Sequence, residues 1–431
     1  MSKVAYGDRD IKAIKKRVKI NFIYQAFRKI ERIIFNYNNI QVKSIATYPM
    51  IKSETQLIEI ANKLAWAFPK KDDLKIYITV SNDLLNYNLK KVDDISYQRN
   101  YLKSNIEHIV LTKDFNANAD LILYVDAKAI LKSNPLKLYK TDILDKNYFS
   151  TVEGGFLQMG YYLTLSKDEK KYFEKLSIEN YKNMMELNKH KNRAYCFVTG
   201  PSFDRYKEFK YEKDSLKVIC NSTVKNDEFL DYINGPDILT FADPVFHFSP
   251  CEYSAVFRDE VLKVYKKYKP YIIVPDKTVA LLLAYYPELK DRIIGMKSKK
   301  EPFNFPTPEY FWIKSSANIL TLYMLPIASS IAYEINIIGA DGRNPDEKYF
   351  WQHSKSAQFS DLMQTVFETH PSFFRDRDYK DYYEEHCNFL KNLIEFGENK
   401  GKKYYSLTNS YIPALKERLK NGCAIMQEKK F

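Results

Sequence analysis

The sequence predicts an α/β protein with two Rossmann-like domains, each built on a parallel, doubly wound sheet. Short apolar runs rich in Ile, Val, Leu and Tyr alternate with stretches of helical spacing along the chain. Repeated strand, loop and helix order is typical of parallel sheets. At 431 residues, of which 45% are hydrophobic, the chain can bury two or three domain cores.

The first segment, residues 1–39, is predicted to be a basic amphipathic helix. Apolar residues recur at helical spacing from Ile11 to Ile34, while lysines and arginines fall largely on the other faces. Such a helix can lie on an anionic bilayer, or it can pack on its own domain with its charged face in water; both interpretations stay open. No apolar run is long enough to span a bilayer, and the N-terminus lacks a secretory signal's apolar core. We expect a cytoplasmic protein, with peripheral membrane contact if the helix lies on the bilayer.

Residues 40–190 are predicted to form an N-terminal α/β domain. Three apolar runs indicate buried strands: "LKIYITVSND", "IEHIVLTKDF" and "ADLILYVDAK". Ser53 is positioned to cap a helix that follows it and reaches Phe68. Glu153 precedes Gly154 and Gly155, which predict a flexible segment, and the carboxylate either faces a cleft or lies in an exposed turn.

Residues 191–431 are predicted to form a C-terminal α/β domain. Its strands are expected in "AYCFVTG", "SLKVICNST", "DILTFADP", "PYIIVPD", "DRIIGM" and "EINIIGADG", with an apolar helix, "SSANILTLYMLPIASSIAYE", before the last. In such a sheet, the ligand crevice lies outside the carboxyl ends of the strands. Polar loop residues follow those ends: Gly200-Pro201-Ser202, Asn221-Ser222, Asp243-Pro244 and Asp341-Gly342-Arg343.

Charge and motifs narrow the classes of function. The net charge of +13 calls for a negatively charged partner, but no zinc-finger, RRM or KH signature supports nucleic acid. Neither a GxGxxG nor a GxxxxGK[ST] motif occurs, so dinucleotide and P-loop chemistry lose their main support. Five cysteines without a CxxC pair indicate reduced thiols, not disulfides or a zinc site.

Three features have a functional and a structural interpretation. The Gly200-Pro201-Ser202 turn can bring backbone N–H groups to a phosphate, or it can be an ordinary turn. His353 can be a general acid or base in a cleft, with Arg343 and Lys355 favouring a nearby phosphate, or a satisfied loop histidine. Asp243 at a strand end can be a nucleophile or base, or it can cap the next helix.

Taken in order, "FVTGPSFDRY", "VICNST", "FADPVFHF", "KSSANILTLYMLPIASSIAYEINIIGADG" and "YFWQHSKS" resemble the motifs of bacterial CMP-sialic acid transferases. The resemblance covers roughly residues 194–412 and includes the late segment "YYSLTNSYIPAL". It implies a metal-independent glycosyltransferase. The two predicted Rossmann-like domains, with a cleft between them, are the GT-B-like layout of many nucleotide-sugar glycosyltransferases. No cofactor is expected beyond the CMP-sugar, which is a substrate.

The resemblance also implies roles for individual residues. His353 falls on the family's general base, and Tyr349 and Arg343 would steady the departing phosphate. The remaining donor contacts implied or favoured by position are Gly200, Pro201, Ser202, Asn221, Ser315, Ser316, Gly339, Asp341 and Lys355. No metal ligand is expected.

One departure from the family changes the expected mechanism. The family's Asn-Pro is Asp243-Pro244 here, and an aspartate can attack an anomeric carbon where an asparagine cannot. This residue and the large N-terminal domain resemble the bacterial retaining β-Kdo transferases, which use CMP-Kdo. The resemblance implies a Kdo adduct on Asp243, with Glu153 as the base that activates the acceptor. The acceptor would be a lipopolysaccharide or capsule glycan on a lipid carrier.

Two alternatives remain. The first is an inverting CMP-sialic acid transferase, with His353 as base and Asp243 as a donor contact. The second, of a different class, is a non-catalytic, membrane-associated scaffold in glycan assembly.

Overall fold

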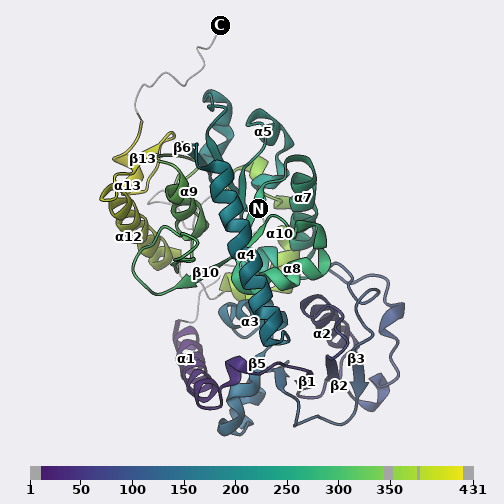
Figure 1. Ribbon diagram of the computed structural model, residues 1–431. Coiled ribbons are helices and arrows are strands. Elements are labelled where there is room, and N and C mark those ends of the chain that lie inside the picture. Colours follow the sequence, from purple (N-terminus) through teal and green to yellow (C-terminus); the bar gives the residue numbers. More distant parts are fainter. Residues whose placement is uncertain (1–10, 344–352, 376–378, 421–431) are drawn as a thin grey trace.

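The computed structural model describes residues 11–343, 353–375 and 379–420. These residues form two parallel sheets with helices packed against them (Figure 1). The five-stranded sheet consists of β1 (Ser44–Tyr48), β2 (Lys75–Thr79), β3 (Ile109–Thr112), β4 (Leu121–Tyr124) and β5 (Thr141–Ile143). The eight-stranded sheet consists of β6 (Arg193–Phe197), β7 (Leu216–Cys220), β8 (Ile238–Thr240), β9 (Tyr271–Pro275), β10 (Ile293–Lys299), β11 (Trp312–Lys314), β12 (Glu334–Ile338) and β13 (Lys403–Ser406).

Helices cover both sheets. The early ones are α1 (Ile11–Ile34), α2 (Glu54–Ala67), α3 (Ser150–Leu163), α4 (Lys167–Asn188), α5 (Asp227–Tyr232), α6 (Pro244–His247) and α7 (Glu252–Tyr268). The later ones are α8 (Val279–Tyr285), α9 (Leu325–Ile331), α10 (Met363–Thr369), α11 (Pro371–Arg375), α12 (Tyr379–Glu398) and α13 (Pro413–Lys416). Ser53 caps α2 as predicted, accepting a hydrogen bond from the Gln56 amide.

Both sheets have the topology of a doubly wound fold. Their strand orders are β3-β2-β1-β4-β5 and β11-β10-β9-β8-β7-β6-β12-β13. In each, the chain winds outward from its first strand to one edge and then continues on the other side of that strand. The order therefore reverses between β1 and β4 and between β6 and β12, where such sheets bind ligands. Two Rossmann-like domains make up the chain, so the predicted fold class is confirmed.

The core of the C-terminal domain lies on both faces of its sheet. In β6, Ala194 and Cys196 face the side covered by α4, α9 and α12, whereas Tyr195 and Phe197 face the side covered by α5, α7 and α8. Because both faces are buried, the strands are continuously apolar, which is why the sequence identified them. The thiols of Cys196, Cys220 and Cys251 are buried and unpaired; Cys423 lies outside the described residues.

Helix α4 belongs to the C-terminal core, although the predicted boundary at residues 190/191 falls after it. Tyr181 and Met184 lie in the core of the eight-stranded sheet, and Asn180 donates to the Ile293 carbonyl at 2.8 Å. Figure 1 shows α4 crossing the front of this domain. The eight-stranded unit thus begins before β6.

A buried interface joins the domains. The indole Nε1 of Trp66 donates to the Phe248 carbonyl at 2.6 Å, and the Arg258 guanidinium lies 3.9 Å from the centroid of the Trp66 ring. Arg258 also donates to the hydroxyl of Tyr101 at 2.7 Å. Since Arg258 is fully buried, these contacts fix the N-terminal domain against α6 and α7.

The flexible segment predicted at Gly154-Gly155 is wrong, because both glycines lie inside α3. A Cβ at Gly154 would lie 2.7 Å from Cγ of Pro244, so the missing side chain lets α3 pack closely on the first residue of α6. Gln158, one turn further on, donates to the Ala242 carbonyl at 2.7 Å. Tertiary packing therefore overrides the low helix propensity of glycine.

Among the described helices, none has the length and apolarity needed to cross a membrane.

Candidate functional site

The predicted loop residues converge where β6 and β12 end. Beyond the last paired residues of these strands, the amide of Gly200 donates to the Gly339 carbonyl at 2.9 Å. This is the point where the strand order reverses, and doubly wound sheets have a crevice outside the strand ends there; hydrogen bonds join the two loops that form its walls.

Glycine is required at both positions. Gly339 has φ of +80°, and a Cβ there would lie 2.1 Å from the Val198 carbonyl oxygen. A Cβ at Gly200 would lie 2.5 Å from the Gly339 carbonyl oxygen and 2.3 Å from Oδ2 of Asp341. The backbone thus lines a small cavity, together with these neighbours: Val198, Thr199, Asn318, Leu320, Ala340, Asp341, Gly342, His386 and Ile412.

Ser202 and Asp341 are bonded to each other. The Ser202 amide donates to Oδ1 of Asp341 at 3.1 Å, and its hydroxyl donates to Oδ2 at 2.9 Å. The same hydroxyl bonds Oγ1 of Thr408 at 2.8 Å. Burial raises the pKa of Asp341, although the bonds from Ser202 oppose the rise. Ser202 therefore positions the carboxylate, and its amide is not available to a phosphate in this arrangement.

His353 lies against the β6 loop. Its Nδ1 is 3.0 Å from the hydroxyl of Thr199, and the Ser354 amide donates to the Thr199 carbonyl at 2.8 Å. Burial lowers the pKa of His353 to about 4. The imidazole is therefore neutral at neutral pH, a state in which it can accept a proton.

Asn221 and Asp243 occupy the ends of the next two strands, β7 and β8. Asn221 has φ of +48°, and its buried Oδ1 has no hydrogen-bond partner among the described residues. Such an acceptor costs free energy unless a water or a ligand bonds it. Asp243 caps α6, because its Oδ1 accepts from the amides of Val245 and Phe246 at 2.9 and 3.2 Å. The capping role is thus present, and it orients the carboxylate at the strand end.

The other predicted residues lie differently. Ser315 is exposed, and the Ser316 hydroxyl bonds Thr321. Neither lines the cavity after β6 and β12, which Asn318 reaches instead. Pro201 and Lys355 are exposed, and Arg343 is the last described residue before a gap. Tyr349 lies outside the described residues.

His386 is a functional candidate that the sequence did not single out. It comes from α12, lines the same cavity, and burial lowers its pKa to about 4. No local pattern marks it, because its position depends on α12 folding back over the site.

A second cavity, of about 330 Å³, lies at the carboxyl ends of the N-terminal strands. It is lined by Ser53, Thr55, Gln56, Glu59, Ile60, Lys63, Gln98, Val125, Leu144, Asp145, Lys146, Asn147 and Thr369. Thr369 ends α10, so the C-terminal domain closes one side of this cavity. A cleft between the two domains, as predicted, is therefore present.

Beside Lys63 and Thr369 lies a buried charge cluster centred on Glu153. Its Oε1 accepts from Nζ of Lys63 at 2.5 Å, and its Oε2 lies 2.9 Å from Nδ1 of His370. Burial alone would raise the pKa of Glu153, but the charges and hydrogen bonds of His370 and Lys63 lower it to about 2. The exposed-turn interpretation of Glu153 is wrong, since its side chain is 1% exposed.

The pKa of His370 is raised. Burial acts against the imidazolium, but the Glu153 carboxylate and bonds to Glu153 and Cys251 favour it more strongly. Glu153 is thus held as an anion between two cationic partners.

Within the described ranges, no group of three or more His, Cys, Asp or Glu side chains is arranged to hold a metal ion.

No family model and no curated protein matches the chain. Among solved structures, the sialyltransferase CstII from Campylobacter jejuni, in complex with a substrate analogue, cytidine-5'-monophosphate, is similar to this chain. The identity is 16% over 55% of this chain and 90% of that chain, with a TM-score of 0.27. A likeness this distant carries no inference about function.

Proposed function

We propose that the chain is a CMP-sugar glycosyltransferase that transfers Kdo from CMP-Kdo to a bacterial surface polysaccharide or lipopolysaccharide. The observation that carries this proposal is the glycine-built crevice between β6 and β12. Thr199 and Gly200, from one motif of the resemblance, meet Asp341 from another there, and His353 from a third bonds Thr199 beside it.

The nucleotide lies across the mouth of the crevice, because the enclosed cavity of about 20 Å³ is too small to hold it. Asp341 repels a phosphate but accepts hydrogen bonds well, so we place the ribose hydroxyls at this carboxylate and the phosphate toward His353 and Arg343. The buried Oδ1 of Asn221 supplies an acceptor for a donor group of the nucleotide or sugar. Ser202 supports Asp341 and does not contact the phosphate, which revises its expected role.

Asp243 is the proposed nucleophile. Its carboxylate attacks the anomeric carbon of Kdo, the bond from that carbon to the phosphate oxygen breaks, and CMP leaves with the electron pair. An acceptor hydroxyl then attacks the same carbon, loses its proton to a base, and releases Asp243. Two inversions give retention overall.

The acceptor binds in the second cavity, between the domains. Glu153 is the base expected from the sequence, yet with a pKa of about 2 it is a weak proton acceptor while Lys63 and His370 hold it. It can act only if acceptor binding loosens those bonds. No metal is needed in this scheme, so a chelator is expected to leave transfer unchanged.

The test is intact-protein mass spectrometry after incubation with CMP-Kdo and, separately, CMP-sialic acid. We expect a Kdo-sized adduct on the peptide that contains Asp243. The variant Asp243→Asn keeps the side-chain shape and should lose the adduct while CMP still raises its melting temperature.

Other outcomes assign the alternatives. CMP release from CMP-sialic acid without any adduct would favour the inverting transferase, for which the neutral His353 is a suitable base. No release and no thermal shift with CMP would favour the scaffold.

A further inference from the structure

Helix α1 packs on the protein with its polar side. From residue 19 onward, the side chains buried against the domain are Tyr24, Glu31 and Arg32, with Arg28 half-buried beside them. Their spacing of i, i+4, i+7 and i+8 is that of one helix face, the face that is normally apolar.

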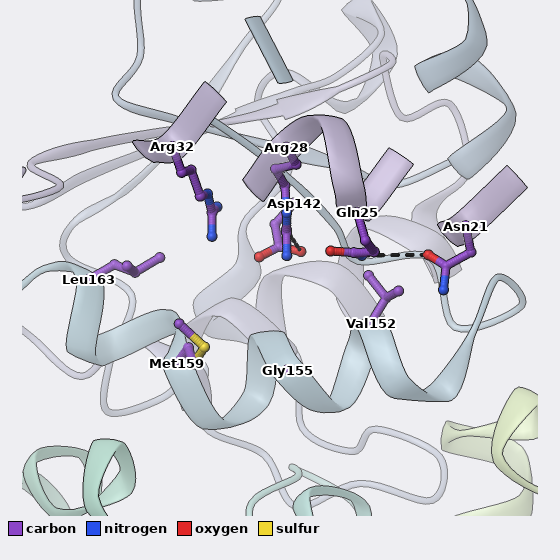
Figure 2. A pocket seen from close by; sticks show the side chains of 9 residues that line it. All are labelled: Asn21, Gln25, Arg28, Arg32, Asp142, Val152, Gly155, Met159 and Leu163. Carbon is purple, nitrogen blue, oxygen red and sulfur yellow. Dashed lines mark hydrogen bonds and ion pairs between the residues drawn. The ribbon is translucent and has the colours of Figure 1, made fainter. Parts of the chain in front are cut away.

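Specific polar bonds hold this face. Arg28 forms an ion pair with Asp142 at 2.9 Å, and the Arg32 Nε donates to the Tyr139 carbonyl at 2.9 Å. Glu31 accepts from the Tyr139 amide at 2.8 Å. Figure 2 shows Arg28 and Arg32 pointing from α1 into a cavity of about 240 Å³ above α3. The orientation of the helix is therefore determined by many directional contacts.

The opposite side of α1 is apolar and faces outward. Phe22 is 72% exposed and Ile34 is 69% exposed, and the side chains between them on this face are Ile23, Phe27, Ile30 and Ile33. We call these six residues the α1 apolar face. Figure 1 places α1 at the margin of the molecule, beside β5. The domain thus leaves uncovered the stripe that an amphipathic helix ordinarily buries.

The exposed apolar surface continues beyond the helix. The 3-10 helices η4 (Ala127–Lys132) and η5 (Pro135–Lys140) carry Leu131 and Leu136, each 69% exposed, and η5 packs along α1. Exposed apolar side chains gathered along α1 and η5 are unfavourable in water and mark an interaction site.

Lysines surround this surface. The exposed ones are Lys19, Lys29, Lys128, Lys132 and Lys137. We propose that the α1 apolar face, with Leu131 and Leu136, docks on an anionic lipid bilayer. Insertion of the Phe and Ile side chains supplies apolar burial, and the lysines meet lipid phosphates. A second copy of the chain fits less well, because its lysines would oppose these lysines.

The experiment is vesicle flotation of the full chain with phosphatidylcholine vesicles that contain 30% phosphatidylglycerol, compared with pure phosphatidylcholine. We expect binding to the anionic vesicles that weakens as salt rises. The variant Ile23→Gln/Phe27→Gln/Ile30→Gln/Ile34→Gln should bind at least tenfold more weakly. Its melting temperature should not fall, because the four side chains contact water in the folded state.

Two further variants separate insertion from charge attraction. Lys29→Glu/Lys132→Glu/Lys137→Glu should lose the preference for anionic vesicles. The control Leu187→Gln/Tyr310→Gln changes exposed apolar residues of the C-terminal domain and should bind like the wild type. In Phe27→Trp, the new indole should be quenched by lipids brominated in their acyl chains.

Three results would overturn the proposal. These are absence of binding to anionic vesicles, binding unaffected by the quadruple variant, and a wild type that is a dimer in solution while the quadruple variant is a monomer. The last would make a second copy the occupant.

Discussion

The two sheets share one topology but present different sites where their strands end. Between β6 and β12 the site is made of backbone, with Gly200 and Gly339 packed too closely to carry side chains. Near the ends of β1 and β4 the cavity is made of side chains, among them Glu59 and Lys63. No glycine is among the described residues that line it.

The difference shows that the loops, not the strand order, determine what each domain binds. A backbone crevice favours a ligand that approaches the main chain closely, such as a nucleotide. A cavity lined by ion pairs has its charge fixed by carboxylates and ammonium groups. This difference supports the proposed placement of the donor at the C-terminal site and of the acceptor at the N-terminal one.

The largest expected effect tests the charged site. Glu153→Gln removes the anion between Lys63 and His370 and leaves buried cations without a counter-charge. We expect the free energy of unfolding to fall by about 3–5 kcal/mol in urea denaturation. A fall in the free energy of unfolding below about 1 kcal/mol, the value typical of exposed pairs, would contradict the distinction drawn between the two sites.

A matched control lies in the same cavity. Glu59 pairs with Lys146 at 2.8 Å, but both side chains are about one-third exposed. Glu59→Gln should therefore cost less than about 1 kcal/mol. Both variants replace a glutamate that pairs with a lysine by glutamine, so they differ in the burial of the ion pair and not in the chemical change.

The second prediction tests the backbone site. Gly339→Ala places a methyl group against the Val198 carbonyl and strains a positive φ, so we expect a loss of about 2–3 kcal/mol of stability. The thermal shift caused by CMP should disappear with it. In contrast, Gly155→Ala meets nothing within 4 Å inside α3 and should stabilise the protein by up to about 1 kcal/mol.

The sequence predicted the C-terminal site better than the N-terminal one for a physical reason. Buried parallel strands are apolar throughout and end in polar loops, so β6, β7, β8 and β12 and the residues after them were identifiable. β1 was not predicted, because it is a five-residue strand, "SIATY", with polar ends. Contacts that depend on packing between distant elements, such as His386 in the crevice, leave no local signal.

Two predictions were wrong or left open, those for the Glu153 segment and for the orientation of α1, because tertiary contacts determine both. Glu153 belongs to a helix that glycine disfavours, and the close approach to Pro244 explains why it forms. For α1, the spacing predicted a helix, but the sequence could not reveal that Arg28 and Arg32 turn inward and Ile34 outward. The bonds to Tyr139 and Asp142 determine that orientation.

The third prediction uses pH to test burial at the C-terminal site. Because burial lowers the pKa of His353 from 6.5 to about 4, the unfolded chain binds a proton between these values that the folded chain does not. The contribution of His353 to the free energy of unfolding is therefore fully kept above pH 6.5 and is lost as the pH drops toward 4. Between pH 7 and pH 4, the free energy of unfolding measured in urea should fall by about 2–3 kcal/mol less in His353→Gln than in the wild type.

The smallest effect distinguishes positioning from direct phosphate contact at Ser202. Ser202→Ala removes the hydroxyl bonds to Asp341 and Thr408 and should cost about 1 kcal/mol of stability. If Ser202 only orients Asp341, Asp341→Asn should abolish most of the CMP-induced thermal shift, and Ser202→Ala added to it should reduce the shift no further. Independent losses in the double variant would instead mean that Ser202 contacts the nucleotide itself, and the backbone alone would no longer account for the donor site.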